Sequence, residues 1–190
     1  MLITDSQVHV WAADRPDRPW PPLAHGSKPM PHKAVPISAE SLLEQMQSAG
    51  VDRAVLVPPS WEGERNDVVA AACQRYPERF RFAARLNYHD PGARAFIANW
   101  RGQRGMVALQ LTFQVPAFQE PLIKGEIDWL WAACERAESP LTIYLPNALL
   151  PHIERAIERY PGLNIIINHF GLTGAARDAA VFADFDKRSE

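Results

Sequence analysis

Two short segments of this sequence carry side chains that can bind a cation or polarise a carbonyl group. The first is Asp-Ser-Gln-Val-His at residues 5–9, and the second is Asn-His-Phe-Gly, which contains His169. Side chains alternate between the two faces of an extended chain, so we expect Asp5, Gln7 and His9 to share one face of a strand. We interpret Gln7, His9 and His169 as the candidate catalytic residues, because imidazole and amide groups bind a substrate oxygen.

Five further side chains lie in the later part of predicted strands or in the loops that follow them, and we expect each to contact a substrate: Trp61, Arg85, Asn87, Gln110 and Tyr144. The guanidinium of Arg85 has the planar fork that binds a carboxylate through two hydrogen bonds. A purely structural ion pair is the alternative for Arg85. Trp61 follows Pro-Pro-Ser, and we interpret it as a pocket lid, with a packed loop anchor as the alternative.

Short apolar runs and helical stripes alternate along the chain and must position these residues. Predicted strands cover residues 2–11, 52–57, 80–86, 107–113, 141–145 and 164–168. Predicted helices cover residues 38–49, 66–76, 92–100, 126–138 and 149–160, with a sixth over 177–187. Such an order of βα units is typical of a parallel sheet that is buried on both faces.

The pattern predicts one α/β domain over residues 1–190, of the (β/α)8 TIM-barrel type with about six βα units present. The alternative is an open doubly wound sheet, but no glycine-rich phosphate turn follows the first strand. The polar residues collect at the carboxyl ends of the predicted strands, where barrel enzymes place their active sites. This distribution favours the barrel.

A proline-rich segment separates the first strand from the first helix. Seven prolines lie between Pro16 and Pro36, and proline both lacks a backbone donor and disfavours helix before it. We therefore predict a long loop over residues 12–37, which packs on the domain through Trp20 and other apolar side chains. Four histidines in loops or at a helix start are interpreted as surface residues: His25, His32, His89 and His152.

The composition limits the partners and the compartment. The net charge is −2 and the basic residues are dispersed, so nothing favours nucleic acid or an anionic membrane as partner. The N-terminus does not resemble a signal peptide and no apolar run reaches ~18 residues, so we expect a cytoplasmic protein. Cys73 and Cys134 fall on apolar helical stripes, which predicts buried free thiols.

The segments around His9 and His169 together resemble two motifs of the amidohydrolase superfamily. That family opens with Asp-x-His-x-His on its first strand, and the Asn-His-Phe-Gly segment resembles its Asp-His-x-Gly element near the end of strand six. The resemblance covers essentially the whole chain, toward the branch of sugar-lactone and 2-pyrone-4,6-dicarboxylate lactonases. It implies a hydrolase of a small carboxylate-bearing lactone or related cyclic ester, in which Gln7, His9 and His169 polarise the ester carbonyl as water attacks.

Gln7 departs from the family pattern, because it stands where the first metal-ligating histidine is usual. An amide oxygen is a poorer ligand for Zn²⁺ than neutral imidazole. The resemblance therefore implies either no cofactor or a weakly bound divalent metal such as Zn²⁺, held by His9 and His169. A non-oxidative decarboxylase of the same superfamily is the alternative enzyme, and Gln7 counts against it because such enzymes keep a fuller set of metal ligands.

The aspartate on strand eight that serves the family as general base has no counterpart before Glu190. We therefore expect a barrel that is incomplete at its C-terminus, and a catalytically inactive truncated barrel is the second class of function. Asp184 and Asp186 lie on the last predicted helix and are interpreted as solvent-exposed. Incomplete closure leaves the first and sixth strands as sheet edges, so we expect a homo-oligomer.

Overall fold

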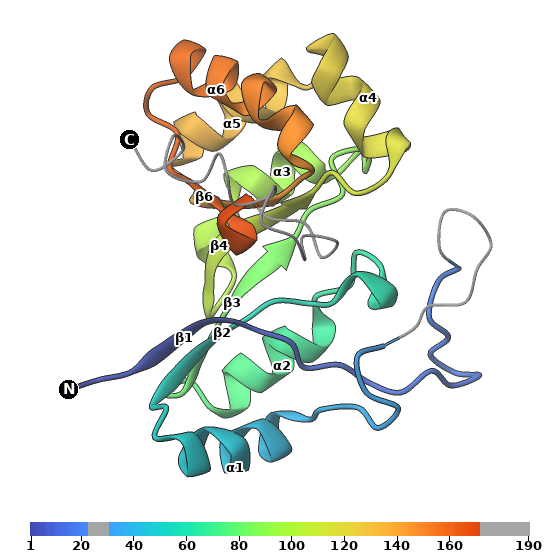
Figure 1. Cartoon of the computed structure of the whole chain (residues 1–190), viewed down its shortest axis with the longest axis vertical. Helices are drawn as coiled ribbons and strands as arrows, with labels where there is room; N and C mark the ends of the chain where they lie inside the picture. Colours follow the sequence, from blue (N-terminus) through green and yellow to red (C-terminus); the bar gives the residue numbers. More distant parts are fainter. Residues whose placement is uncertain (23–30, 172–190) are drawn as a thin grey trace, which may run out of the picture.

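A computed structural model describes residues 1–22 and 31–171. Six parallel strands form one curled sheet in the order of the sequence (Figure 1). They are β1 (Thr4–Val8), β2 (Arg53–Leu56), β3 (Phe80–Arg85), β4 (Met106–Thr112), β5 (Leu141–Tyr144) and β6 (Ile165–Ile167). The prediction of a TIM-barrel type of fold with about six βα units is confirmed, and the sheet forms the larger part of such a barrel.

Helices cover the outer side of the curled sheet, with α1 and α2 beside the first strands and α5 and α6 beside the last ones (Figure 1). They are α1 (Ala39–Ala49), α2 (Asp67–Arg75), α3 (Ala93–Ala98), α4 (Pro116–Lys124), α5 (Asp128–Ala137) and α6 (Leu150–Arg159). Short 3-10 turns are η1 (Ser60–Glu62), η2 (Trp100–Gly102), η3 (Asn147–Leu149) and η4 (Asn168–Gly171). Local sequence sets the limits of α1: Ser41 N donates to Ser38 Oγ at its start, and Gly50 ends it in the left-handed conformation.

Two elements differ from the sequence prediction. Helix α4 was not predicted; Pro116 occupies its first turn, where a missing N–H costs little, but Pro121 lies inside it. Strand β1 is shorter than predicted, because Val10 and Trp11 leave the sheet and are buried beyond its end. The helix predicted over 177–187 lies outside the described residues.

The two faces of the sheet carry different side chains. The outer face presents large apolar residues such as Phe82 and Ile143, which belong to the same core as Trp131 of α5. The inner face has a small core built around Ala83 and Ala108. Such small side chains leave room above them, inside the curl, for a layer of polar groups.

Strand register puts polar residues of the inner face in rows. Arg85 is paired with Gln110, and Gln110 is paired with Thr142 on the next strand. Two positions further along β4, Thr112 is paired with Tyr144. These rows lie toward the carboxyl ends of the strands, so the sheet gathers the side chains at one end of the curl.

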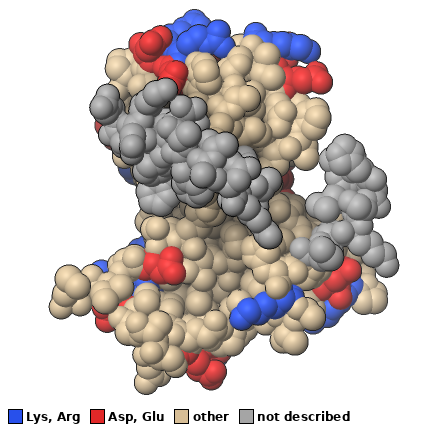
Figure 2. All heavy atoms as spheres, in the orientation of Figure 1, with Lys and Arg blue, Asp and Glu red and all other residues tan. Residues whose placement is uncertain are grey.

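Among the described strands, β1 and β6 lie at the ends of the sheet and each pairs on one side only. Ile166 of β6 is 54% exposed. On the face shown in Figure 2, acidic and basic side chains lie in small groups of both signs near the margins. None of the helices in the described ranges has the length and apolar character that a bilayer crossing requires.

Both cysteines are buried and free, as the helical stripes predict. Burial raises the pKa of Cys73 and of Cys134 to about 12. A thiol with such a pKa stays protonated at neutral pH, so neither cysteine is a nucleophile of the kind that catalysis requires.

Candidate functional site

A bulge in β1 decides which of its polar side chains face the inside of the curl. Asp5 is paired with Ala54, whereas Val8 is paired with the residue only two positions further along β2. Because Ala54 faces the helices, its partner Asp5 lies on that side too. The prediction that Asp5 shares a face with Gln7 and His9 is therefore wrong, since strict alternation fails across a bulge.

Gln7 and His169 meet at the carboxyl end of the sheet. Gln7 Nε2 lies 3.5 Å from His169 Nε2. The ring of Tyr144 stands edge-on to the imidazole of His169, with 5.3 Å between the ring centroids. His169 has a φ of 55° in the turn η4 that follows β6, and its side chain is exposed. Three candidate residues from three strand ends thus lie together, with one imidazole open to a ligand.

The two ring nitrogens of His9 have different surroundings. Nδ1 lies 2.7 Å from the carbonyl oxygen of Val57, which can only accept, so Nδ1 carries the proton and Nε2 of the neutral ring is an acceptor. Burial lowers the pKa of His9 below its usual 6.5, outweighing the hydrogen bond to Val57, and positive charge on His32, His169 and Arg85 lowers it further. At neutral pH His9 therefore offers a lone pair at Nε2.

Trp61 forms a wall beside His9. Its ring centroid lies 6.0 Å from that of His9, 5.4 Å from that of Trp11 and 4.9 Å from that of His32. Trp61 is 6% exposed, which favours the packed anchor over the lid. His32 is exposed, as expected of a surface residue, but its ring centroid lies 5.9 Å from that of His9, so it borders the site.

The buried carboxylate of Glu62 fastens the proline-rich segment beside this wall. Glu62 Oε1 accepts hydrogen bonds from Ala12 N at 3.1 Å and from Arg18 Nη1 at 2.6 Å. Arg18 also pairs with Asp67 at the start of α2, and Trp20 Nε1 donates to Ala12 O at 3.0 Å. The segment that follows β1 is therefore packed on η1 and α2.

Arg85 ends β3 with a side chain that is 6% exposed. Its Nη2 donates to Glu64 Oε1 at 2.9 Å and to Thr112 Oγ1 at 3.1 Å, while its buried Nε has no partner among the described residues. The side chain of Asn66 holds the backbone of Arg85 through hydrogen bonds of 2.8 and 3.0 Å. Arg85 and Asn87 line one cavity of about 360 Å³.

The side chain of Gln110 is buried and hydrogen-bonded within the protein, which favours a structural role over the predicted contact with a substrate. It is 3% exposed, and its Oε1 accepts hydrogen bonds from Asn168 Nδ2 at 3.0 Å and from Thr142 Oγ1. Its Nε2 donates to Leu111 O at 3.1 Å. This network joins β4 and β5 to the turn after β6, and it therefore helps to position His169.

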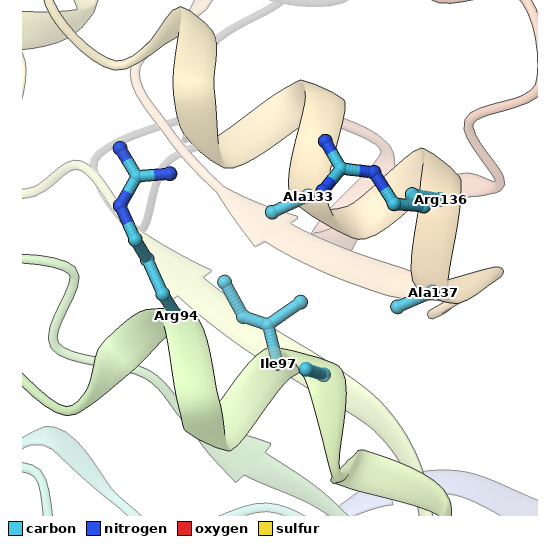
Figure 3. Close-up of a pocket in the computed structure, with 6 residues that line it drawn as sticks. Arg94, Ile97, Ala133, Arg136 and Ala137 are labelled. Carbon is cyan, nitrogen blue, oxygen red and sulfur yellow. The ribbon is translucent and has the colours of Figure 1, made fainter.

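A second cavity, of about 320 Å³, lies between α3 and α5 (Figure 3). Arg94 of α3 and Arg136 of α5 flank it, and Ile97 lies between them. None of the candidate residues lines this cavity, which belongs to the helical layer on the other side of the sheet.

The described residues do not complete a zinc site. Zinc in proteins takes three or four ligands from histidine, cysteine and carboxylate side chains. Within residues 1–22 and 31–171, no three such side chains are grouped so that they could hold a metal ion. His9, His169 and the Gln7 amide are a weaker donor set for zinc than three imidazoles are.

Several residues that shape the site escaped the sequence analysis. Glu64 contacts Arg85, which is 21 positions away in the sequence, and Asn168 contacts Gln110, which is 58 positions away. No local pattern predicts such contacts. Thr112 did have a signal, because it lies two positions beyond Gln110 on one strand and so shares its face.

Comparison with known proteins gives one family and a group of solved structures. Residues 4–188 match the family model described as amidohydrolase. Comparison with curated protein sequences finds no match. The matched residues include both segments that carry His9 and His169.

The solved structures share the fold. One is a probable 2-pyrone-4,6-dicarboxylic acid hydrolase from Acinetobacter baumannii with citric acid bound, with a TM-score of 0.69, 19% identity and coverage of 99% of this chain and 65% of that chain. A Pseudomonas putida protein provisionally assigned as such a hydrolase has a TM-score of 0.68, 25% identity and coverage of 96% and 63%. A 2,6-dihydroxybenzoate decarboxylase with 2,6-dihydroxybenzoate bound has a TM-score of 0.56, 17% identity and coverage of 90% and 66%. This chain thus spans about two-thirds of the length of the proteins that it matches.

Proposed function

This chain belongs to the amidohydrolase family, and we propose that it hydrolyses a small lactone that carries a carboxylate. The observation that carries the proposal is the meeting of Gln7 and His169, 3.5 Å apart, on a sheet end that also holds the acceptor nitrogen of His9. The buried guanidinium of Arg85, whose charge helps to lower the pKa of His9, is a group that can bind the carboxylate of such a lactone. The likeness to the two dicarboxylic acid hydrolases supports the same substrate class.

In the proposed reaction, the carbonyl oxygen takes the place of the contact between Gln7 and His169. It accepts an N–H from the Gln7 amide and one from His169 in the tautomer that carries the proton on Nε2, and these bonds stabilise the oxyanion that forms as water attacks. Nε2 of His9 takes the proton from that water, which its lone pair allows at neutral pH. The ring C–O bond then breaks, and the proton passes from His9 to the departing oxygen to give a hydroxy acid. Arg85 binds the carboxylate of the substrate. His9 thereby takes a different task from the carbonyl polarisation that the sequence resemblance implies.

The test is hydrolysis of a small lactone panel by the purified chain, followed by base uptake at constant pH. The panel contains 2-pyrone-4,6-dicarboxylate, a sugar acid lactone and an uncharged lactone of similar ring size. We expect turnover of a lactone that carries a carboxylate and little of the uncharged one. Failure to open any ring would contradict the proposal.

A non-oxidative decarboxylase is the second candidate, and the fold shared with 2,6-dihydroxybenzoate decarboxylase is the observation that favours it. The weak donor set around Gln7 counts against it, as the sequence resemblance already implies. Trapping of labelled CO₂ from 2,6-dihydroxybenzoate distinguishes the two, since lactone hydrolysis releases none. A chain that neither opens a ring nor releases CO₂ is the inactive barrel.

A further inference from the structure

Arg85 is already engaged in the free protein. The carboxylate of Glu64 accepts a hydrogen bond from Arg85 Nη2 at 2.9 Å, and Thr112 Oγ1 lies 3.1 Å from the same nitrogen. A ligand carboxylate that binds the side of a guanidinium takes N–H groups from Nε and one Nη together. Among the described residues, Nε of Arg85 has no hydrogen-bond partner. The neighbouring Nη2, however, is paired with the carboxylate of Glu64, which neutralises the charge of the guanidinium.

Glu64 and Arg85 differ in how firmly they are held. The side chain of Glu64 is 31% exposed, whereas that of Arg85 is 6% exposed. Asn66 fixes the backbone of Arg85 through both its N–H and its carbonyl group, and Thr112 remains bonded to the guanidinium if Glu64 moves. Glu64 can therefore rotate toward water at low cost while Arg85 stays in place.

Both side chains line the cavity of about 360 Å³ at the carboxyl end of β3. A ligand carboxylate that enters this cavity meets two negative groups, Glu64 and Asp90, and one positive group, Arg85. It can replace Glu64 on Arg85 without leaving a buried charge unpaired. An uncharged ligand cannot replace the negative charge of Glu64 beside Arg85, so the ion pair between Glu64 and Arg85 stays intact.

We propose that Glu64 is a specificity-determining residue that occupies Arg85 in the free protein and is displaced by the carboxylate of an anionic ligand. The inference rests on the proposed function for the identity of that ligand, a carboxylate-bearing lactone. The exchange keeps the charge of the guanidinium balanced in both states. Glu64 thereby sets how strongly the cavity selects carboxylates over neutral molecules.

Citrate is the probe, because it carries carboxylates and does not react, and its binding to the whole chain is measured by isothermal titration calorimetry. Glu64→Gln removes the competing charge, so we expect citrate to bind about three- to tenfold more tightly. Glu78→Gln is the matched control, because the exposed Glu78 undergoes the same change of charge but does not line the cavity. We expect the control variant to change citrate affinity less than twofold. The triamide of citric acid is the uncharged control ligand, and it should bind no more tightly to Glu64→Gln than to the parent chain.

Unchanged or weaker binding of citrate to a folded Glu64→Gln protein overturns the inference. Glu64→Asp provides a second variant, since it keeps the charge but shortens the reach to Arg85, and an intermediate gain in affinity supports displacement. Thermal unfolding of each variant verifies that it is folded. The binding and hydrolysis experiments test the two proposals separately. Tighter citrate binding to Glu64→Gln without lactone hydrolysis supports the role of Glu64 and contradicts the proposed function. Lactone hydrolysis with unchanged citrate binding contradicts only the role of Glu64.

Discussion

Gln7 and His169 are 162 positions apart in the sequence, and their Nε2 atoms lie 3.5 Å apart in the structure. The contact joins the first described strand to the turn after the last one, across the open side of the curled sheet. A substrate oxygen beside these two nitrogens would be held by groups from both ends of the sheet, so the site depends on the curvature of the whole sheet.

Replacement of Gln7 by leucine tests its part in the reaction. Leucine has similar size but no N–H for the oxyanion, so we expect kcat to fall about 100-fold with a small change in KM. Gln74→Leu on the exposed side of α2 is the control and should retain the parent rate. A loss smaller than threefold in the Gln7 variant would show that its amide does not contact the reacting carbonyl.

The protonation of His9 makes the protein sensitive to acid. Its pKa in the folded protein is lower than the usual 6.5, mainly because of burial, so between these values the unfolded chain binds a proton that the native state excludes. The free energy of unfolding should therefore be highest above pH 6.5 and decline as the pH falls through this window. Urea denaturation at several pH values measures the decline.

His9→Asn is the variant that isolates this effect, because asparagine can still donate to the Val57 carbonyl but does not titrate. Its stability should depend less on pH below 6.5 than that of the parent chain. Other histidines, including His152 with its lowered pKa, contribute equally to both proteins. Identical pH profiles would argue against a buried, neutral His9.

Asn66→Ala should destabilise the end of β3. The side chain of Asn66 bonds both backbone groups of Arg85, and its removal leaves them without partners in a part-buried position. We expect a loss of about 2–3 kcal/mol in the free energy of unfolding, measured by urea denaturation. Asn164→Ala, at an exposed position directly before β6, is the control. Equal stability of the two variants would be inconsistent with this account.

Glu62→Ala should release the proline-rich segment. The substitution leaves Arg18 partly buried with only Asp67 to pair with, at a cost of roughly 3 kcal/mol. Limited proteolysis should then cleave residues 12–22 faster than in the parent chain, because Ala12 N also loses its acceptor. Glu78→Ala at an exposed site is the control. A cleavage rate equal to that of the control would indicate that the segment is held by other contacts.

Self-association through the sheet edges remains a prediction. Among the described strands β1 and β6 each have one unpaired side, and Ile166 is 54% exposed on β6. We expect light scattering to give a mass above the 21.3 kDa of one chain, and Ile166→Lys to lower it, since charge on an edge strand opposes pairing. A parent chain that is monomeric at all concentrations would contradict the prediction.

The strands and the helices other than α4 were predictable because each depends on local pattern. Ser38 and Gly50 delimit α1 by capping, and the carboxyl ends of parallel strands bring Arg85 and Tyr144 to the same end of the sheet. Helix α4 was missed because Pro121 argues against a helix interior unless the rest of the structure compensates for it.

The finer arrangement of the site was not predictable from local pattern. His32 lies beside His9 although it comes from an irregular segment, in which no periodic pattern predicts the position of a side chain. The side of the sheet on which Asp5 lies depends on a bulge in β1. The sequence of β1 does not predict this bulge, since it contains neither glycine nor proline. No local pattern specifies contacts between segments that lie far apart in the sequence.

Because β1 contains an extra residue at its bulge, the direction of the side chains after the bulge does not depend on the number of residues within it. Between the rows of Ala54 and Leu56 the strand accommodates one residue more than its neighbour does, and Gln7 and His9 still point inward after it. Deleting Ser6 would thus yield an unbroken ladder and leave the inward pair in position. The bulge therefore allows β1 to lose one residue before Gln7 without turning Gln7 and His9 away from the inside of the curl.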